Sequence, residues 1–126
     1  MKITSVYTGP DGESHFRELE LPLDLTDGMA WHTAPLKVGD VFFRATAGEQ
    51  DMEWHKAPRR QFVIILGGEL EIEVFSGDKR LLRPGDVLLA EDTTGRGHLS
   101  RSTNRQAIIV PILQTDWFRE EKNQAK

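Results

Sequence analysis

The chain contains no cysteine, which excludes disulfides, thiolate metal sites and a cysteine nucleophile. It has no apolar run close to the ~20 residues needed to span a bilayer. The longest such run, residues 62–66, has the length of a strand. Basic residues are not in excess, since 16 Lys and Arg stand against 20 Asp and Glu for a net charge of −4, and a general nucleic-acid binder would usually show a basic stripe. The first fifteen residues lack the apolar core of a signal peptide. We therefore expect a cytoplasmic protein that binds neither nucleic acid nor membrane.

At 126 residues the chain has the length of one domain, which we expect to span residues 1–126. A domain of this size can bury roughly two thirds of the surface of its unfolded chain. It can therefore fold around its own core without cross-links.

Strand signals dominate the sequence. Within residues 69–75, acidic and apolar side chains alternate as far as Val74, which predicts a half-buried strand with Leu70, Ile72 and Val74 on the core face. Residues 61–66 are apolar on both faces and should lie deep. Gly67 and Gly68 between these runs predict a tight hairpin.

Further turn signals follow at residues 76–78, 83–86 and 104. Eight or more short strands at this spacing predict an all-β barrel or jelly roll. The tail from Thr115 could form a short helical turn anchored by Trp117 and Phe118.

Two motif-like segments carry a family resemblance. The cupin superfamily has a first motif of the form G-x5-H-x-H-x3-4-E-x6-G and a second of the form G-x5-P-x-G-x2-H-x3-N. Here His55 matches the first histidine, Ala57 stands at the second, Gln61 stands at the glutamate and Gly68 fits the closing glycine. Gly85 and His98 match the second motif with two extra residues between them, Glu91 replaces its proline and Ser102 its asparagine.

Residues 41–113 thus resemble a small cupin with a degenerate metal motif. The resemblance implies a double-stranded β-helix, the cupin jelly-roll barrel, with its core at about residues 41–113. It names no reaction, because one fold hosts many activities.

The usual cupin metal site has three imidazoles and a carboxylate around a divalent ion. His55, Gln61 and His98 are what this chain retains of it, and they could hold Fe, Mn, Ni or Zn. Because one imidazole and one negative charge are missing, we favour a site without metal and leave the cofactor open. On a regular strand Glu53 and Asp51 would share the facing of His55 and could complete a site.

The alternative use of His55 and His98 is acid–base catalysis without metal, since histidine can take and give a proton near neutral pH. The competing interpretation is that both are hydrogen-bonded core histidines.

Four further residues are expected to bind substrate: Arg44, Gln61, Glu91 and Arg96. Arg44 shares a strand face with apolar neighbours and could clamp a carboxylate or phosphate, or else pair with an acid such as Glu53. Glu91 directly follows a buried strand. Arg96 lies in a glycine-flanked loop of the kind that carries function at a barrel mouth, or is a solvated loop charge.

These observations leave three hypotheses. The first is a small-molecule-processing enzyme of isomerase or lyase type, metal-free or weakly metal-dependent, that transfers protons on a small polar or anionic substrate in the barrel. The second is a non-catalytic module that binds a small ligand, and the third is a metal-dependent dioxygenase. In each case we expect a homodimer, because edge strands need cover.

Overall fold

The computed structural model of the chain describes residues 1–114, which form ten strands and no helix. The strands are β1 (Lys2–Thr8), β2 (Ser14–Glu20), β3 (Leu25–Thr26), β4 (Trp31–His32), β5 (Phe42–Ala45), β6 (Glu49–His55), β7 (Gln61–Glu73), β8 (Lys79–Leu82), β9 (Val87–Glu91) and β10 (His98–Pro111). The all-β prediction is confirmed. The expected helical turn after Thr115 lies outside the described residues. Within them, no helix has the length and hydropathy needed to cross a membrane.

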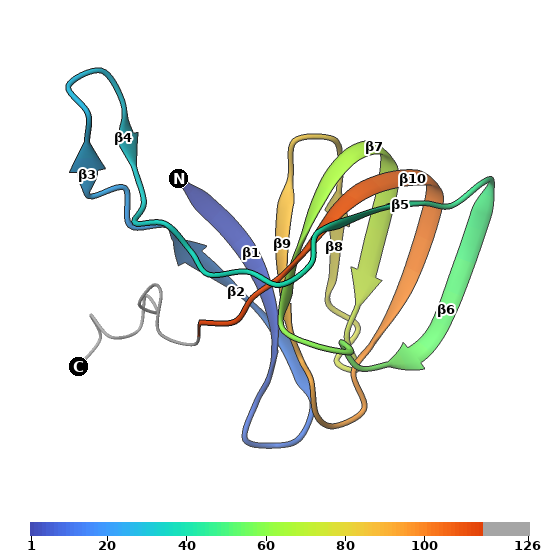
Figure 1. Cartoon of the computed structure of the whole chain (residues 1–126). Helices are drawn as coiled ribbons and strands as arrows, with labels where there is room; N and C mark the ends of the chain where they lie inside the picture. Colours follow the sequence, from blue (N-terminus) through green and yellow to red (C-terminus); the bar gives the residue numbers. More distant parts are fainter. Residues whose placement is uncertain (115–126) are drawn as a thin grey trace.

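Eight of the strands form one mixed sheet that curls into a roll (Figure 1). The order is β2-β1-β9-β7-β10-β5, with β6 also beside β10 and β8 beside β7. Neighbours are antiparallel except β1 and β9, which run parallel. The expected jelly roll is therefore found, although the outermost strands β2 and β5 are not paired with each other in the described sheet. Strands β3 and β4 form a separate small hairpin that projects away from the roll (Figure 1).

Strand β10 lies at the centre of the half of the roll that carries the site. It pairs along its length with β7 on one side, and with β5 and β6 in succession on the other. The predicted hairpin at Gly67 and Gly68 is wrong, because β7 runs straight through both glycines. The predicted turn at Asn104 is wrong for the same reason, since Asn104 lies inside β10. Both signals mark a bulge in the pairing of β7 with β10, and not the end of either strand.

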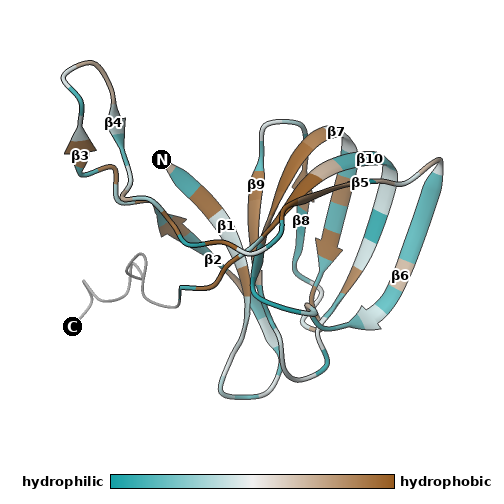
Figure 2. Cartoon of the chain, viewed as in Figure 1, coloured by the Kyte–Doolittle hydropathy of each residue, from teal (hydrophilic) through white to brown (hydrophobic). Residues whose placement is uncertain are grey.

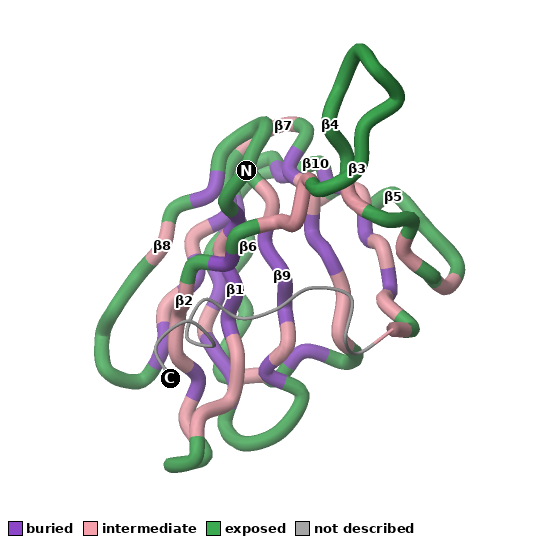
Figure 3. Tube along the Cα trace, turned by 90° about the vertical axis from the view of Figure 1, so that its left-hand side faces the viewer, coloured by how far each residue is buried: buried purple, intermediate pink, exposed green. Residues whose placement is uncertain are grey.

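The interior of the roll is apolar. Leu70, Ile72 and Val74 are each at most 2% exposed, which confirms the core face predicted from their alternation. They belong to the larger of two hydrophobic clusters, most of whose members lie on β1, β7, β8, β9 and β10. Figure 2 shows the brown apolar positions concentrated on β7, β9 and β10 and the largely hydrophilic β6 at the open side. Figure 3 shows the same division, with buried positions along the central strands and an exposed β3–β4 hairpin.

The N-terminal hairpin of β1 and β2 extends the sheet beyond the expected 41–113 core. Val6 of β1 is fully buried in the larger cluster and Leu19 of β2 in the smaller one. The smaller cluster, with Phe62 and Leu89, covers the other face of β7 and β9. Strand β9 and the first part of β7, residues 61–65, are therefore covered on both faces and form a wall behind the site.

Candidate functional site

His55 and His98 lie directly opposite each other on neighbouring strands, at the end of β6 and the start of β10. Their ring centroids are 4.5 Å apart. The two imidazoles therefore converge, as the sequence suggests. Gly97, with a φ of 82°, makes this approach possible, because a Cβ there would collide with the His55 carbonyl oxygen.

A buried carboxylate orients the ring of His98. Its Nδ1 lies 2.6 Å from Oδ2 of Asp92, which is 0% exposed. The same oxygen accepts a hydrogen bond of 2.7 Å from the Ser14 hydroxyl. Because an ionised carboxylate only accepts hydrogen bonds, Nδ1 of His98 carries the hydrogen. The neutral ring then keeps its lone pair on Nε2.

The ring of His55 is fixed in the same tautomer by the main chain. Its Nδ1 lies 2.7 Å from the carbonyl oxygen of Glu53, and a carbonyl oxygen can only accept. The basic nitrogen of neutral His55 is therefore also Nε2. His55 is partly exposed, whereas His98 is buried, so the pair joins a buried imidazole to one that solvent reaches.

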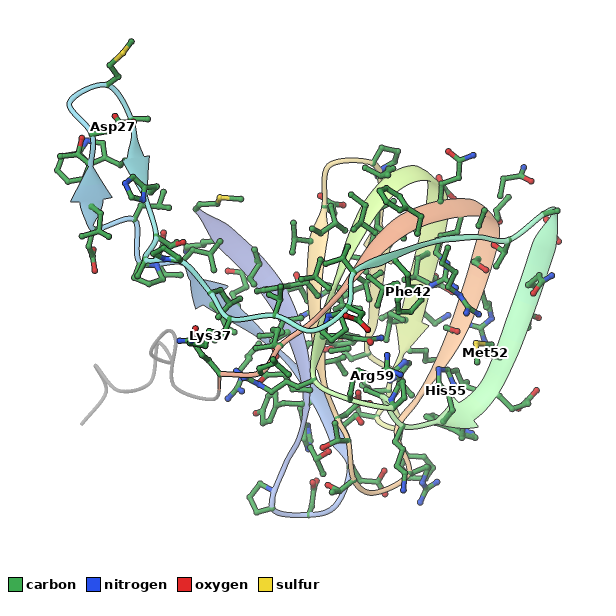
Figure 4. All side chains as sticks on the ribbon, in the orientation of Figure 1. Asp27, Lys37, Phe42, Met52, His55 and Arg59 are labelled. Carbon is green, nitrogen blue, oxygen red and sulfur yellow. The ribbon has the colours of Figure 1, made fainter. Side chains whose placement is uncertain are left out.

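Both rings line a cavity of about 250 Å³ inside the roll. Its floor is apolar and includes Val63, Ile72 and Ile109. The polar side chains of the lining are Arg44, His55, Arg59, Gln61, His98, Ser100 and Arg105. Figure 4 shows the labelled Phe42, Met52, His55 and Arg59 gathered on this side of the roll, far from the β3–β4 hairpin. No Asp or Glu of the described chain lines the cavity.

Two of the residues expected to bind substrate are in place. Arg44 of β5 lines the cavity at an exposed position. Gln61 lines it too, and its side-chain oxygen accepts a hydrogen bond of 2.8 Å from Arg59.

The other two, Glu91 and Arg96, lie elsewhere. On β9 the cavity is lined by Leu88 and Ala90, so alternation turns Glu91 to the opposite face. Arg96 lies outside the lining, where its guanidinium covers the ring of Phe75 at 3.6 Å and pairs with Glu13 at 3.1 Å.

Arg105 is a cavity residue that the sequence did not reveal. Buried positions on β10 fall on Ser100 and Ser102 and then shift to Arg105 and Ala107. The register of β10 against β7 breaks between Thr103 and Gln106. An unbroken alternation would turn Arg105 outward, and the bulge turns it inward. The available signal is Asn104 together with Gly67 and Gly68, residues that equally indicate turns.

The donor set fits a divalent cation poorly. The register between β10 and β6 shifts between His98 and Ser100, so that Met52 lines the cavity beside His55. The expected shared facing of Glu53 and Asp51 with His55 is therefore not found. No group of three His, Asp or Glu that could hold a metal occurs within residues 1–114.

Three further features of the lining act against a cation. Gln61 offers only a neutral oxygen, which already binds Arg59. Arg44 and Arg105 add positive charge to the same cavity.

Comparison with known proteins gives limited similarity. No family model matches the chain. A segment of 40 residues, 32% of the chain, is 42% identical to oryzines biosynthesis cluster protein J of Aspergillus oryzae, and it spans about a fifth (22%) of that relative's length. A solved structure described as ethanolamine utilization protein Q of Salmonella typhimurium LT2 aligns with 89% of this chain and 95% of its own, at 14% identity and a TM-score of 0.34.

Proposed function

We propose that the protein catalyses proton transfer on a small polar or anionic molecule bound in the cavity, as an isomerase or lyase would. The observation that carries the proposal is the His98–Asp92 pair beside His55. A buried carboxylate on Nδ1 of a histidine, with Nε2 left free, is the arrangement of a general base.

In the proposed step, Nε2 of His98 removes a proton from a carbon atom next to a carbonyl or carboxyl group of the substrate. The electron pair of the broken C–H bond moves onto the oxygen of that group. Asp92 stabilises the imidazolium that forms, because its charge lies 2.6 Å from Nδ1. The arginines of the cavity stabilise the negative charge that develops on the substrate oxygen.

His55 is assigned the exchange of protons with solvent. Its ring is adjacent to His98 and partly exposed. It can therefore return a proton to the substrate or release one to water. Its Nδ1 can donate to the Glu53 carbonyl in both the neutral and the charged state.

The second candidate is ligand binding without catalysis. The largely apolar floor of the cavity favours it, since such pockets bind small molecules in many proteins that catalyse nothing.

Deuterium exchange distinguishes catalysis from ligand binding without catalysis, and it can be measured before the substrate is identified. Pools of small oxo acids, hydroxy acids and unsaturated acids are incubated with the protein in D2O, and NMR follows the loss of C–H signals. We expect exchange in one compound class. His98→Ala should reduce its rate about 10²- to 10⁴-fold, and Asp92→Asn should reduce it too, because the amide favours the wrong tautomer of His98.

His15→Ala is the matched control, because His15 bonds Asp11 at the surface and lies outside the cavity. It should leave exchange unchanged. If acids bind the protein but show neither deuterium exchange nor turnover, catalysis is contradicted and ligand binding without catalysis is supported. Full exchange in His98→Ala would contradict the assigned base.

A further inference from the structure

Arg105 is a buried cation for which residues 1–114 supply no counter-charge. It is 8% exposed and lines the cavity. Its Nε is buried and has no hydrogen-bond partner among the described residues. Burial, and after it the positive charge of Arg44, lower the pKa of Arg105, with no carboxylate acting in the other direction. A guanidinium does not lose its proton in proteins, so the charge stays in the cavity.

A structural role does not account for this placement. A buried charge that lacks a partner costs stability. The chain nevertheless turns Arg105 inward through the bulge in β10. By contrast Arg101, on the same strand, pairs with Glu71 at 2.9 Å and Glu73 at 3.0 Å. The difference indicates that the partner of Arg105 is a bound molecule.

The remainder of the cavity defines that molecule. Arg44 adds a second guanidinium at the exposed side, and no Asp or Glu of residues 1–114 lines the cavity. The apolar part of the lining includes Val63, Ile72 and Ile109. A volume of about 250 Å³ holds about eight water-sized groups.

We propose that Arg105 and Arg44 bind the acidic group, carboxylate or phosphate, of a small organic acid whose apolar part contacts Val63, Ile72 and Ile109. The inference rests on the proposed function for its location, and it names the substrate class of the same site. Binding places the acid within the cavity that the His55–His98 pair lines. Paired N–H donors of a guanidinium match either acidic group.

The test is thermal unfolding of the full chain with sodium butyrate, with inorganic phosphate, and with sodium chloride at equal ionic strength. Butyrate probes a carboxylate with an apolar stem, and phosphate probes the phosphate group alone. We expect one of the two to raise the Tm of the wild-type protein by several degrees above the chloride control. The probe that does so assigns the acidic group.

The decisive variants are Arg105→Met and its matched control Arg101→Met, on the same strand. Arg105→Met should lose the ligand-dependent rise, and its Tm without ligand should equal or exceed that of the wild type, because an unpaired buried charge is removed. Arg101→Met should keep the full rise. If Arg105→Met does not fold, Arg44→Met at the exposed side serves instead and should reduce the rise.

No rise with either probe, an equal rise in Arg105→Met, or a loss of the rise in Arg101→Met would each overturn the proposal. The result is separable from that of the proposed function. Deuterium exchange that persists in Arg105→Met at low substrate concentration would contradict the acid-binding role and leave proton transfer intact. Acid binding that depends on Arg105, without any deuterium exchange, would support the acid-binding role and contradict proton transfer.

Discussion

Glu91 and Asp92 are adjacent acids that serve two different faces of the wall formed by β9. The Asp92 carboxylate lies behind His98 at the cavity. The Glu91 carboxylate, on the outer face, accepts hydrogen bonds from the Ser5 hydroxyl at 2.6 Å, from Arg60 at 2.8 Å and from Arg17 at 3.2 Å. The latter contacts join β1, β2 and β9 and the turn before β7, so we assign Glu91 to stability.

Replacing Glu91 by Gln should destabilise the fold without changing the site. The Glu91 side chain is 11% exposed. The neutral side chain of Gln lacks the negative charge that pairs with Arg17 and Arg60 in the native protein. We expect a loss of about 1–3 kcal/mol in the free energy of unfolding, measured by urea denaturation. The Tm rise produced by the binding acid should stay the same. If the free energy of unfolding is unchanged and the Tm rise with the acid is lost, the assignment of Glu91 to stability is wrong and a role in acid binding is indicated.

At the scale of the elements, the bulge in the pairing of β7 with β10 sets the direction of Arg105, the proposed binding residue. Gly68 has a φ of 68°, and a Cβ there would collide with the carbonyl oxygen of Asn104. Asn104 itself has a φ of 46°. Its side-chain oxygen accepts a hydrogen bond from the main-chain N–H of Gly48, with an N···O distance of 2.8 Å. This bond connects the bulge to the chain before β6. The position of Arg105 therefore depends on a backbone contact that only glycine allows at residue 68.

Gly68→Ala should lower the Tm and weaken acid binding together, because the added Cβ pushes the bulge apart. We expect a loss of at least about 1–3 kcal/mol in unfolding free energy, and a smaller rise of Tm with the acid. Gly77→Ala is the control, since Gly77 also has a positive φ, of 94°, but nothing lies within 4 Å of a Cβ there. Equal losses in the two variants, with acid binding intact in both, would contradict a special role for the bulge.

Patterns within one strand were sufficient to predict much of the fold. The alternation of residues 69–75 predicted the core face of β7, and the motif-like segments predicted that His55 and His98 converge. Arg105 could not be predicted in this way, because its inward direction comes from the pairing of two distant strands. The same holds for Met52, which a shift in register places in the cavity where Glu53 was expected. Alternation along a strand predicts facing only up to the next bulge.

At the scale of the whole molecule, the charge of the chain and that of the cavity are opposite. The net charge is −4, yet the cavity contains three arginines and no acid of the described chain. A negative surface repels polyanions at long range, whereas a local positive cavity attracts small anions. That the protein binds a small molecule and not nucleic acid remains a prediction.

The homodimer remains a prediction. Strands β5 and β6 lie at an edge of the sheet. They carry the exposed side chains of Phe42, Phe43 and Trp54, and exposed sheet edges are usually covered by another chain or segment. Sedimentation velocity over a range of concentrations measures the assembly. A protein that stays monomeric at high micromolar concentration would contradict the expectation.

The central claim is that His55 and His98 converge in the cavity with Nε2 free on both rings, and imidazole ¹⁵N NMR tests it most directly. At a pH where the rings are neutral, both should carry their hydrogen on Nδ1. Asp92→Asn should change the tautomer of His98 and leave that of His55 unaltered. A hydrogen on Nε2 of His98 in the wild-type protein, or two rings with the tautomer mixture of free histidine, would contradict the account.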